Sequence, residues 1–150
     1  MVGNIGSPSQ INYTALGHDV NLASRLEGLN SHYGTSILVD GQTHRCCEHM
    51  FRWRHLDTVR VKGSETPEPI YELLGTHDVD HSDEADWAKR YENVLGLYRS
   101  KEFDQALSVL EEFLETTPSD ISVQRLAALC KECRIRLPND WDGVTRFLKK

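Results

Sequence analysis

The spacing of apolar residues along the chain changes near residue 75. Before that point, short runs rich in β-branched and aromatic residues alternate with one helical pattern. After residue 83, apolar residues recur every three or four positions, as they do on one face of a helix. The intervening segment 76–83 is polar and short of large apolar residues, which is typical of a linker. The pattern therefore predicts two units, 1–75 and 84–150.

The first unit begins with turn residues followed by a strand and a helix. Gly3, Gly6, Ser7 and Pro8 predict a turn ahead of a short strand over residues 11–16. The helix is expected over residues 20–32, because one face of this segment is apolar: Val20, Leu22, Ala23, Leu26 and Leu29.

The ends of this helix have their own signals. His18 or Asp19 is expected to cap its start. Gly34 is expected to end it, because glycine adopts the left-handed conformation that closes many helices.

The rest of the first unit is predicted to be mainly β. The runs between turn residues indicate, in order, a buried strand over 36–40, a short helix over 42–49, and strands over 51–56, 58–62 and 70–74. A hairpin-like loop separates the last two strands. The first unit is thus expected to be α+β.

The second unit is expected to be helical. Its apolar spacing predicts two amphipathic helices separated by a break near residues 100–102, followed by a third helix over 121–134. The pair resembles one tetratricopeptide-type unit, with Ala106 as the small packing residue and Pro118 after its end. Because one repeat rarely buries enough surface to fold alone, this tail should pack on the first unit or on a partner.

Composition narrows the protein class. Hydrophobic residues at 39% and charged residues at 27% are typical of a soluble globular protein, and the net charge of −6 argues against nucleic-acid partners. No apolar stretch approaches the roughly 20 residues that span a bilayer, so we expect a cytoplasmic chain. The residues after Met1 resemble the middle of a folded element, and we expect the chain to start inside a larger protein.

The four cysteines are expected to be free thiols in a reducing compartment. Cys130 and Cys133 form a lone C-x-x-C, while Cys46 and Cys47 lie near two histidines. A zinc site usually needs two ligand pairs at suitable spacing, so no metal site is predicted and small buried thiols are the favoured interpretation.

Asn21 and Arg25 are the first candidates for chemistry. They stand four positions apart, so a helix places them on one face, one turn apart. Asn can donate and accept hydrogen bonds, and Arg offers a fork of donors suited to phosphate. Such a pair could orient a ribose and stabilise charge on a phosphate. Taken alone, however, most surface pairs of this kind are merely solvated.

The sequence around this pair resembles the signature of class III adenylate and guanylate cyclases. Residues 13–26 read YTALGHDVNLASRL, which fits the family pattern YTxxGxxVNxAxRL. Similar matches are VGNIGS at residues 2–7, VKG at 61–63 and PIYEL at 69–73. The resemblance covers residues 2–75. It implies an α+β fold, the C-terminal half of a ferredoxin-like cyclase domain, followed here by the tetratricopeptide-like helical tail.

The resemblance also implies roles for four residues. As catalytic residues, Asn21 would orient the ribose and Arg25 would stabilise charge on the α-phosphate of ATP. Lys62 would bind the terminal phosphates. Thr14 would contact the purine base, and a threonine there favours adenine over guanine. His18 departs from the family, which often has Asp there.

The same family binds two metal ions, Mg²⁺ or Mn²⁺, through two aspartates on earlier strands. This chain does not contain those strands, so we expect it to be inactive alone. Family members form head-to-tail dimers with shared sites, which implies a homodimer or a complementing cyclase protomer as partner.

A second, shorter resemblance lies near the C-terminus. The segment PNDWDGV at residues 138–144 resembles the end of bacterial cyclases that carry an extracellular CHASE2 sensor and a membrane segment. The parent protein would then be anchored in the inner membrane, with its catalytic end in the cytoplasm. A tryptophan that only packs against the last helix would explain Trp141 equally simply.

Two other functions remain open at this point. The helical tail could be a protein-interaction module, with the cyclase half as a remnant. The parent could also be a guanylate cyclase, although Thr14 favours adenine.

Overall fold

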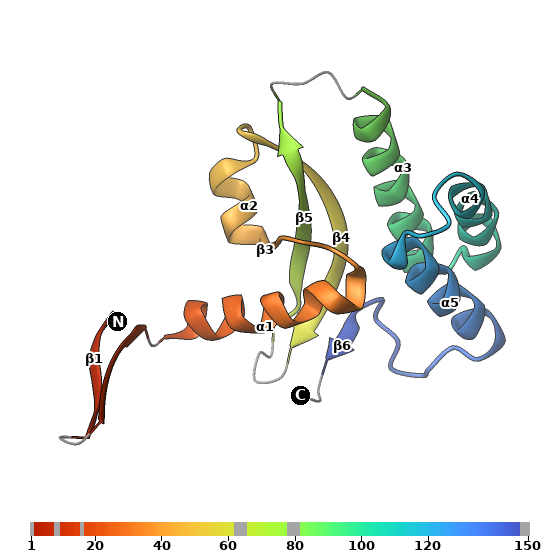
Figure 1. Ribbon diagram of the computed structural model, residues 1–150. Helices are drawn as coiled ribbons and strands as arrows, with labels where there is room; N and C mark the ends of the chain where they lie inside the picture. Colours follow the sequence, from red (N-terminus) through yellow and green to blue (C-terminus); the bar gives the residue numbers. More distant parts are fainter. Residues whose placement is uncertain (1, 8–9, 16, 62–65, 78–81, 148–150) are drawn as a thin grey trace.

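Figure 1 shows a computed structural model of the chain, which describes residues 2–7, 10–15, 17–61, 66–77 and 82–147. A four-stranded sheet has the strand order β3-β5-β4-β6, and β1 and β2 form a separate hairpin. This arrangement confirms the predicted α+β class. The elements of the first half are β1 (Val2–Ser7), β2 (Gln10–Ala15), α1 (His18–Tyr33), β3 (Leu38–Asp40), α2 (Gly41–Cys47), β4 (Phe51–Val61) and β5 (Glu68–Thr76).

The helical tail contains α3 (Ser82–Arg99), α4 (Phe103–Thr116), α5 (Ile121–Ile135) and a last short strand, β6 (Thr145–Phe147). The break between the first two helices lies where the sequence predicts it, at Lys101, which adopts a left-handed backbone conformation with φ of 66°. Ala106 is completely buried, and Pro118 follows the end of α4. The side chain of Asp120 caps α5 by accepting a hydrogen bond of 2.9 Å from the backbone N–H of Val123.

The main sheet is built around the antiparallel pair β4 and β5. The prediction of two strands over 51–56 and 58–62 is wrong, because β4 continues through Asp57 as one strand. A register shift between His55 and Asp57 absorbs the interruption. Strand β3 is half-buried at the sheet edge, so its predicted full burial is also wrong.

The short strand predicted over 11–16 is confirmed as β2, which pairs with β1 in a hairpin, and the predicted turn residue Pro8 lies outside the described residues. Gly3 and Gly6 lie within a strand, and the strands pair from Val2 opposite Ala15 to Ser7 opposite Gln10. Figure 1 shows this hairpin projecting from the body of the molecule at the start of α1.

Both ends of α1 are set by glycines. Its N-cap is Gly17, which has no side chain, so the prediction that His18 or Asp19 caps the helix is wrong. Asp19 lies inside the first turn instead, where its charge still favours the helix dipole. The predicted stop at Gly34 is confirmed, with a left-handed φ of 70°.

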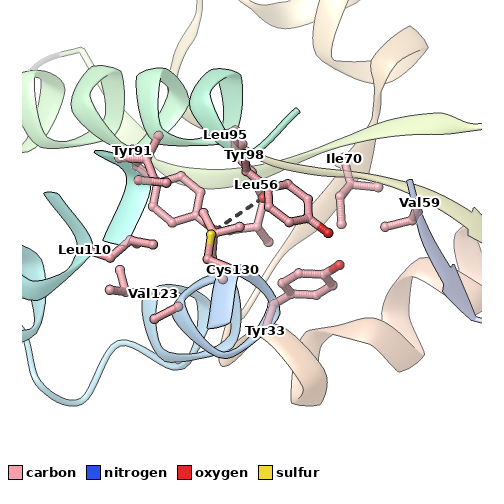
Figure 2. Close-up of a cluster of buried hydrophobic side chains, with 14 of the residues drawn as sticks. Tyr33, Leu56, Val59, Ile70, Tyr91, Leu95, Tyr98, Leu110, Val123 and Cys130 are labelled. Atoms are coloured by element: carbon pink, nitrogen blue, oxygen red, sulfur yellow. Dashed lines mark hydrogen bonds between the residues drawn. The ribbon is translucent and has the colours of Figure 1, made fainter. Parts of the chain in front are cut away.

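One hydrophobic core joins the sheet to the helical tail. Figure 2 shows Leu56 of β4 between Tyr33 of α1, Tyr91 of α3 and Cys130 of α5. The shared core confirms the prediction that the tail packs on the first unit. The domain boundaries at 75 and 84 stay a prediction. Among the described residues, none of the helices combines the length and apolar character needed to cross a membrane.

The two faces of the sheet differ in what covers them. Arg54 and Glu72 are paired across β4 and β5 and point toward α3 and the start of α5. The neighbouring residues Trp53 and Tyr71 point to the opposite face, where the ring of His44 from α2 stacks on Tyr71 at 3.8 Å. The tail thus lies on one face and α2 on the other.

Candidate functional site

Helix α1 presents Asn21 and Arg25 to solvent. Both side chains are exposed, and neither forms a hydrogen bond or ion pair with any described residue. The apolar face of the helix is buried below them through Leu22, Leu26 and Leu29. Packing therefore fixes the helix while leaving the amide and the guanidinium available to a ligand.

An open groove of about 670 Å³ lies along another side of α1. Val20 and Ala23 line it from the helix, and Ile37 lines it from the segment before β3. Asn21 and Arg25 stand two positions on either side of Ala23, which places them roughly 160° around the helix from it. The groove is therefore a separate feature from the Asn21 and Arg25 face.

The other two predicted site residues are less fully placed. Thr14 stands in β2 opposite Gly3, three residues before the glycine that starts α1. Lys62 lies outside the described residues and follows Val61, the last residue of β4. Val61 pairs with Phe147, whose ring lies 5.3 Å from that of His32 in α1. The structure thus brings Asn21 and Arg25 together, and it leaves their distances to Thr14 and Lys62 untested.

A buried polar junction connects the end of α1 to the sheet. The hydroxyl of Tyr33 donates a hydrogen bond of 2.6 Å to Oδ2 of Asp57, and the Thr145 hydroxyl donates one of 2.7 Å to the same oxygen. The backbone N–H of Thr58 donates to Oδ1 at 2.7 Å. Burial raises the pKa of Asp57, and these three hydrogen bonds oppose that rise by favouring the carboxylate.

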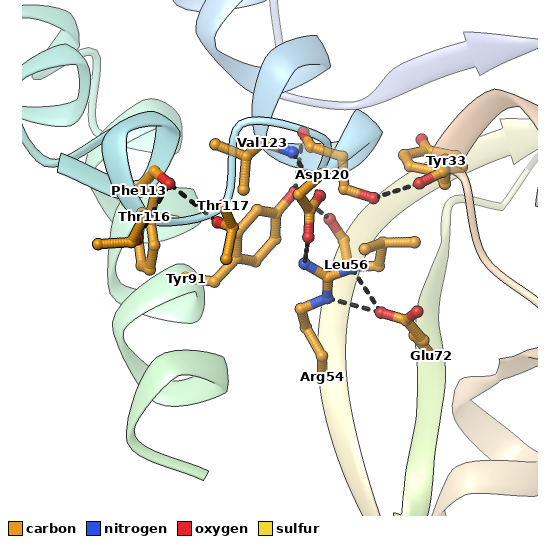
Figure 3. A network of polar contacts seen from close by, with 11 residues as sticks. Tyr33, Arg54, Leu56, Glu72, Tyr91, Phe113, Thr116, Thr117, Asp120 and Val123 are labelled. Atoms are coloured by element: carbon orange, nitrogen blue, oxygen red, sulfur yellow. Dashed lines mark hydrogen bonds and ion pairs between the residues drawn. The ribbon is translucent and has the colours of Figure 1, made fainter. Parts of the chain in front are cut away.

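A second buried network joins β4, β5 and α5. Nε of Arg54 donates to Glu72 at 2.7 Å, and Nη1 donates to Asp120 at 2.9 Å (Figure 3). The guanidinium carbon also lies 4.4 Å from the ring centre of Trp87 and 4.9 Å from that of Tyr91. Burial raises the pKa of Glu72, and the charge of Arg54 opposes the rise. One arginine therefore links the sheet to two helices of the tail.

Sequence reasoning missed both networks. Their signal was visible, because Arg54 and Asp57 interrupt the apolar pattern of a strand. A charged residue in the buried face of a strand needs partners, since burying it alone is costly. The pattern could have marked the two residues but not the side chains that pair with them, which come from positions 18 to 88 residues away.

Proteins of known activity resemble this chain. Adenylate cyclase 1 of Rhizobium meliloti is 45% identical over 75 residues, half of this chain and 11% of the relative. An adenylate cyclase of Anabaena cylindrica is 40% identical over 76 residues, 49% of this chain and 15% of the relative. The chain is therefore related to a part of adenylate cyclases. No family profile and no solved structure matches it.

A third relative extends the similarity into the tail. The terminal-differentiation-specific adenylate cyclase of Dictyostelium discoideum is 32% identical over 127 residues, which is 80% of this chain and 6% of the relative. A match of that length must include part of the helices after residue 84. The similarity to this relative therefore reaches the helical tail. The chain spans only a small share of the length of each of the three adenylate cyclases.

The cysteines of this cyclase-related chain are all free thiols. Cys130 and Cys133 are buried in α5, and burial raises the pKa of the Cys130 thiol to about 12. Within the described ranges, no three His, Cys, Asp or Glu side chains are close enough to hold a metal ion. The described residues therefore do not fit the metal pair that the family resemblance implies.

Proposed function

We propose that this chain supplies the ribose- and phosphate-binding part of a class III adenylate cyclase, whose complete protein converts ATP to cyclic AMP and pyrophosphate. The observation that carries this proposal is the placement of Asn21 and Arg25. Within the cyclase signature, they are exposed on one face of α1 and have no partner among the described residues. Relatives named adenylate cyclase support the same assignment.

The proposed roles follow from the chemistry of each side chain. Asn21 orients the ribose through its amide, which both donates and accepts hydrogen bonds. Arg25 binds the α-phosphate with its fork of donors and stabilises the charge that grows there as the ribose hydroxyl attacks. Lys62 binds the terminal phosphates and Thr14 contacts adenine. The roles of these last two residues rest on the sequence resemblance alone.

The rest of the active site comes from outside this chain in this proposal. In the complete enzyme, aspartates on preceding strands or on a partner protomer would hold Mg²⁺ or Mn²⁺, which would supply the polarisation of the phosphate. The CHASE2-type assignment and the membrane anchor of the parent protein rest on residues 138–144. Trp141 in that segment packs edge-on against Tyr98 at 5.4 Å, which gives it a structural role as well.

The interaction-module alternative finds less support. The apolar faces of α3, α4 and α5 are buried against one another and against the sheet. Ile121 and Ile135 are the large apolar side chains of the described tail that remain exposed. Two separate side chains do not form the continuous apolar face that a docked peptide would require.

The test is cyclic nucleotide production by complementation. The chain is mixed with an intact adenylate cyclase whose own counterparts of Asn21 and Arg25 are replaced by alanine, and ATP or GTP is added with Mn²⁺. We expect cyclic AMP from the mixture and none from either protein alone. A mixture that stays silent although the chain is folded contradicts the proposal, and cyclic GMP as the main product favours the guanylate cyclase alternative.

A further inference from the structure

The C-terminal end of α1 is capped by the helical tail. The last carbonyls of a helix have no partner inside it, and buried ones need a donor from elsewhere. For Tyr33 that donor is Ser122 at the start of α5, whose hydroxyl donates a buried hydrogen bond of 2.7 Å to the Tyr33 carbonyl oxygen. The two residues are 89 positions apart in the chain. The tail thus completes the hydrogen bonding of the helix that carries Asn21 and Arg25.

Other tail residues surround the same helix end. The side chain of Ile121 packs against Gly34, so closely that a Cβ at this glycine would lie 2.8 Å from it. The guanidinium carbon of Arg125 lies 5.1 Å from the Tyr33 ring centre and 5.2 Å from that of Phe147. Contacts from both α5 and β6 therefore meet at the last turn of α1.

Asp57 of β4 connects the last turn of α1 and β6 to the sheet through hydrogen bonds. It accepts hydrogen bonds from Tyr33 of α1 and Thr145 of β6 on one oxygen. The cavity beside these groups measures about 10 Å³, which leaves room for one water at most. Such close packing transmits a displacement instead of absorbing it.

Toward the opposite end of α1, the described residues contribute packing, through the buried Leu22, and no hydrogen bond to the tail. The helix continues from the β1–β2 hairpin, which does not pair with the main sheet. Helix α1 packs mainly against β3 and α5, and its last two residues, His32 and Tyr33, also contact Asp57 of β4 and Phe147 of β6. The described side-chain hydrogen bonds that join α1 to other elements, and so help to fix the direction in which it presents Asn21 and Arg25, therefore lie at its C-terminal end.

We propose that the helical tail positions α1 and thereby regulates the site that carries Asn21 and Arg25. Ser122 and Tyr33 are positioning residues in this view, and a displacement of α5 changes the presentation of the two site residues. The inference rests on the proposed cyclase function for its catalytic consequence. Its mechanical part, the control of α1 by α5, can be tested without any activity.

The mechanical test is hydrogen–deuterium exchange of the whole chain with Ser122→Ala or Tyr33→Phe. Backbone amides of α1 should exchange about threefold to tenfold faster, the factor that loss of one hydrogen bond typically produces. Amides of α4 should keep their rates. Ser108→Ala is the matched control, because this serine is exposed on α4, and Tyr98→Phe is the control for loss of a buried tyrosine hydroxyl.

The catalytic test uses the complementation mixture at saturating chain, well below the unfolding temperature. Ser122→Ala should lower kcat about threefold to tenfold while the KM for ATP changes little, because the substitution displaces Asn21 and Arg25, which are proposed to act in the transition state. If the mixture with the wild-type chain makes no cyclic AMP, the proposed cyclase function is wrong, and the hydrogen-exchange result still tests the control of α1 by α5. Unchanged α1 exchange in both variants, or faster exchange everywhere including α4, overturns the positioning role even if the mixture is active.

Discussion

The hydroxyl of Tyr33 donates a hydrogen bond of 2.6 Å to the carboxyl group of Asp57, which joins the last residue of α1 to the middle of β4. Asp57 is almost fully buried, and the remaining hydrogen bonds to its carboxyl group come from Thr58 and from Thr145 of the C-terminal strand. Three elements that are distant in sequence therefore depend on one carboxyl group.

Replacement of Asp57 by Asn should lower the free energy of unfolding by about 1–3 kcal/mol, because an amide nitrogen would face donors that now meet carboxylate oxygens. Urea unfolding of both proteins at several pH values measures the difference.

The difference should also depend on pH. Burial raises the pKa of Asp57 above the ordinary value of about 4. The Asp57 carboxyl group then binds a proton more tightly in the folded state than in the unfolded state. The stability that protonation contributes is fully present below about pH 4 and is lost as the pH rises through the raised pKa. The advantage of the wild type over Asp57→Asn should therefore shrink as the pH rises above that ordinary value and through the raised pKa. A constant or growing advantage would show that the pKa is not raised.

Arg54 should be the most sensitive charged residue of the sheet. Arg54→Ala leaves the carboxyl groups of Glu72 and Asp120 buried without their partner and should cost about 3–5 kcal/mol in denaturant unfolding. Arg90→Ala is the matched control, because its ion pair with Glu112 is exposed and should cost about 1 kcal/mol or less. Equal losses in the two variants would contradict the assigned role.

Two glycines should respond to alanine in opposite directions. Gly34→Ala forces a left-handed conformation on alanine and a contact of 2.8 Å with Ile121, so a loss of about 1–3 kcal/mol is expected. Gly96 lies exposed inside α3 with no atom near the added methyl group, and Gly96→Ala should stabilise by about 0.5–1 kcal/mol. Thermal unfolding compares both variants with the wild type, and a stabilised Gly34→Ala would refute the described junction.

The cysteines should differ widely in reactivity. Cys46 is exposed, whereas Cys130 is completely buried with its thiol pKa raised to about 12. Since the thiolate is the reactive form, alkylation of the native chain at pH 8 should modify Cys46 and spare Cys130. Mass spectrometry of peptides after timed alkylation gives the order, and addition of urea should remove the difference. Early modification of native Cys130 would contradict its burial.

Most helices could be predicted because their signals are local. Apolar spacing located α3, α4 and α5, and Gly34 and Lys101 lie at the predicted ends and breaks. Strand β6 could not be predicted in this way, because three residues show no period. Its existence depends on pairing with β4, which lies more than 80 residues earlier.

The site was partly predictable for a different reason. Asn21 and Arg25 belong to a contiguous motif, so their common face follows from helix geometry. The residues that hold this helix, such as Ser122 and Asp57, belong to no motif. Only the folded chain brings them to Tyr33, since their pairing is a property of tertiary contacts.

The most direct measurement is the complementation assay with substitutions at the proposed site itself. Arg25→Ala and Asn21→Ala should each lower cyclic AMP production by about 100-fold or more, as expected when one group that stabilises the transition state is removed. Arg45→Ala, an exposed arginine on α2, should leave production unchanged. Wild-type production with either Arg25→Ala or Asn21→Ala would contradict the assignment of this chain as the ribose- and phosphate-binding part of an adenylate cyclase.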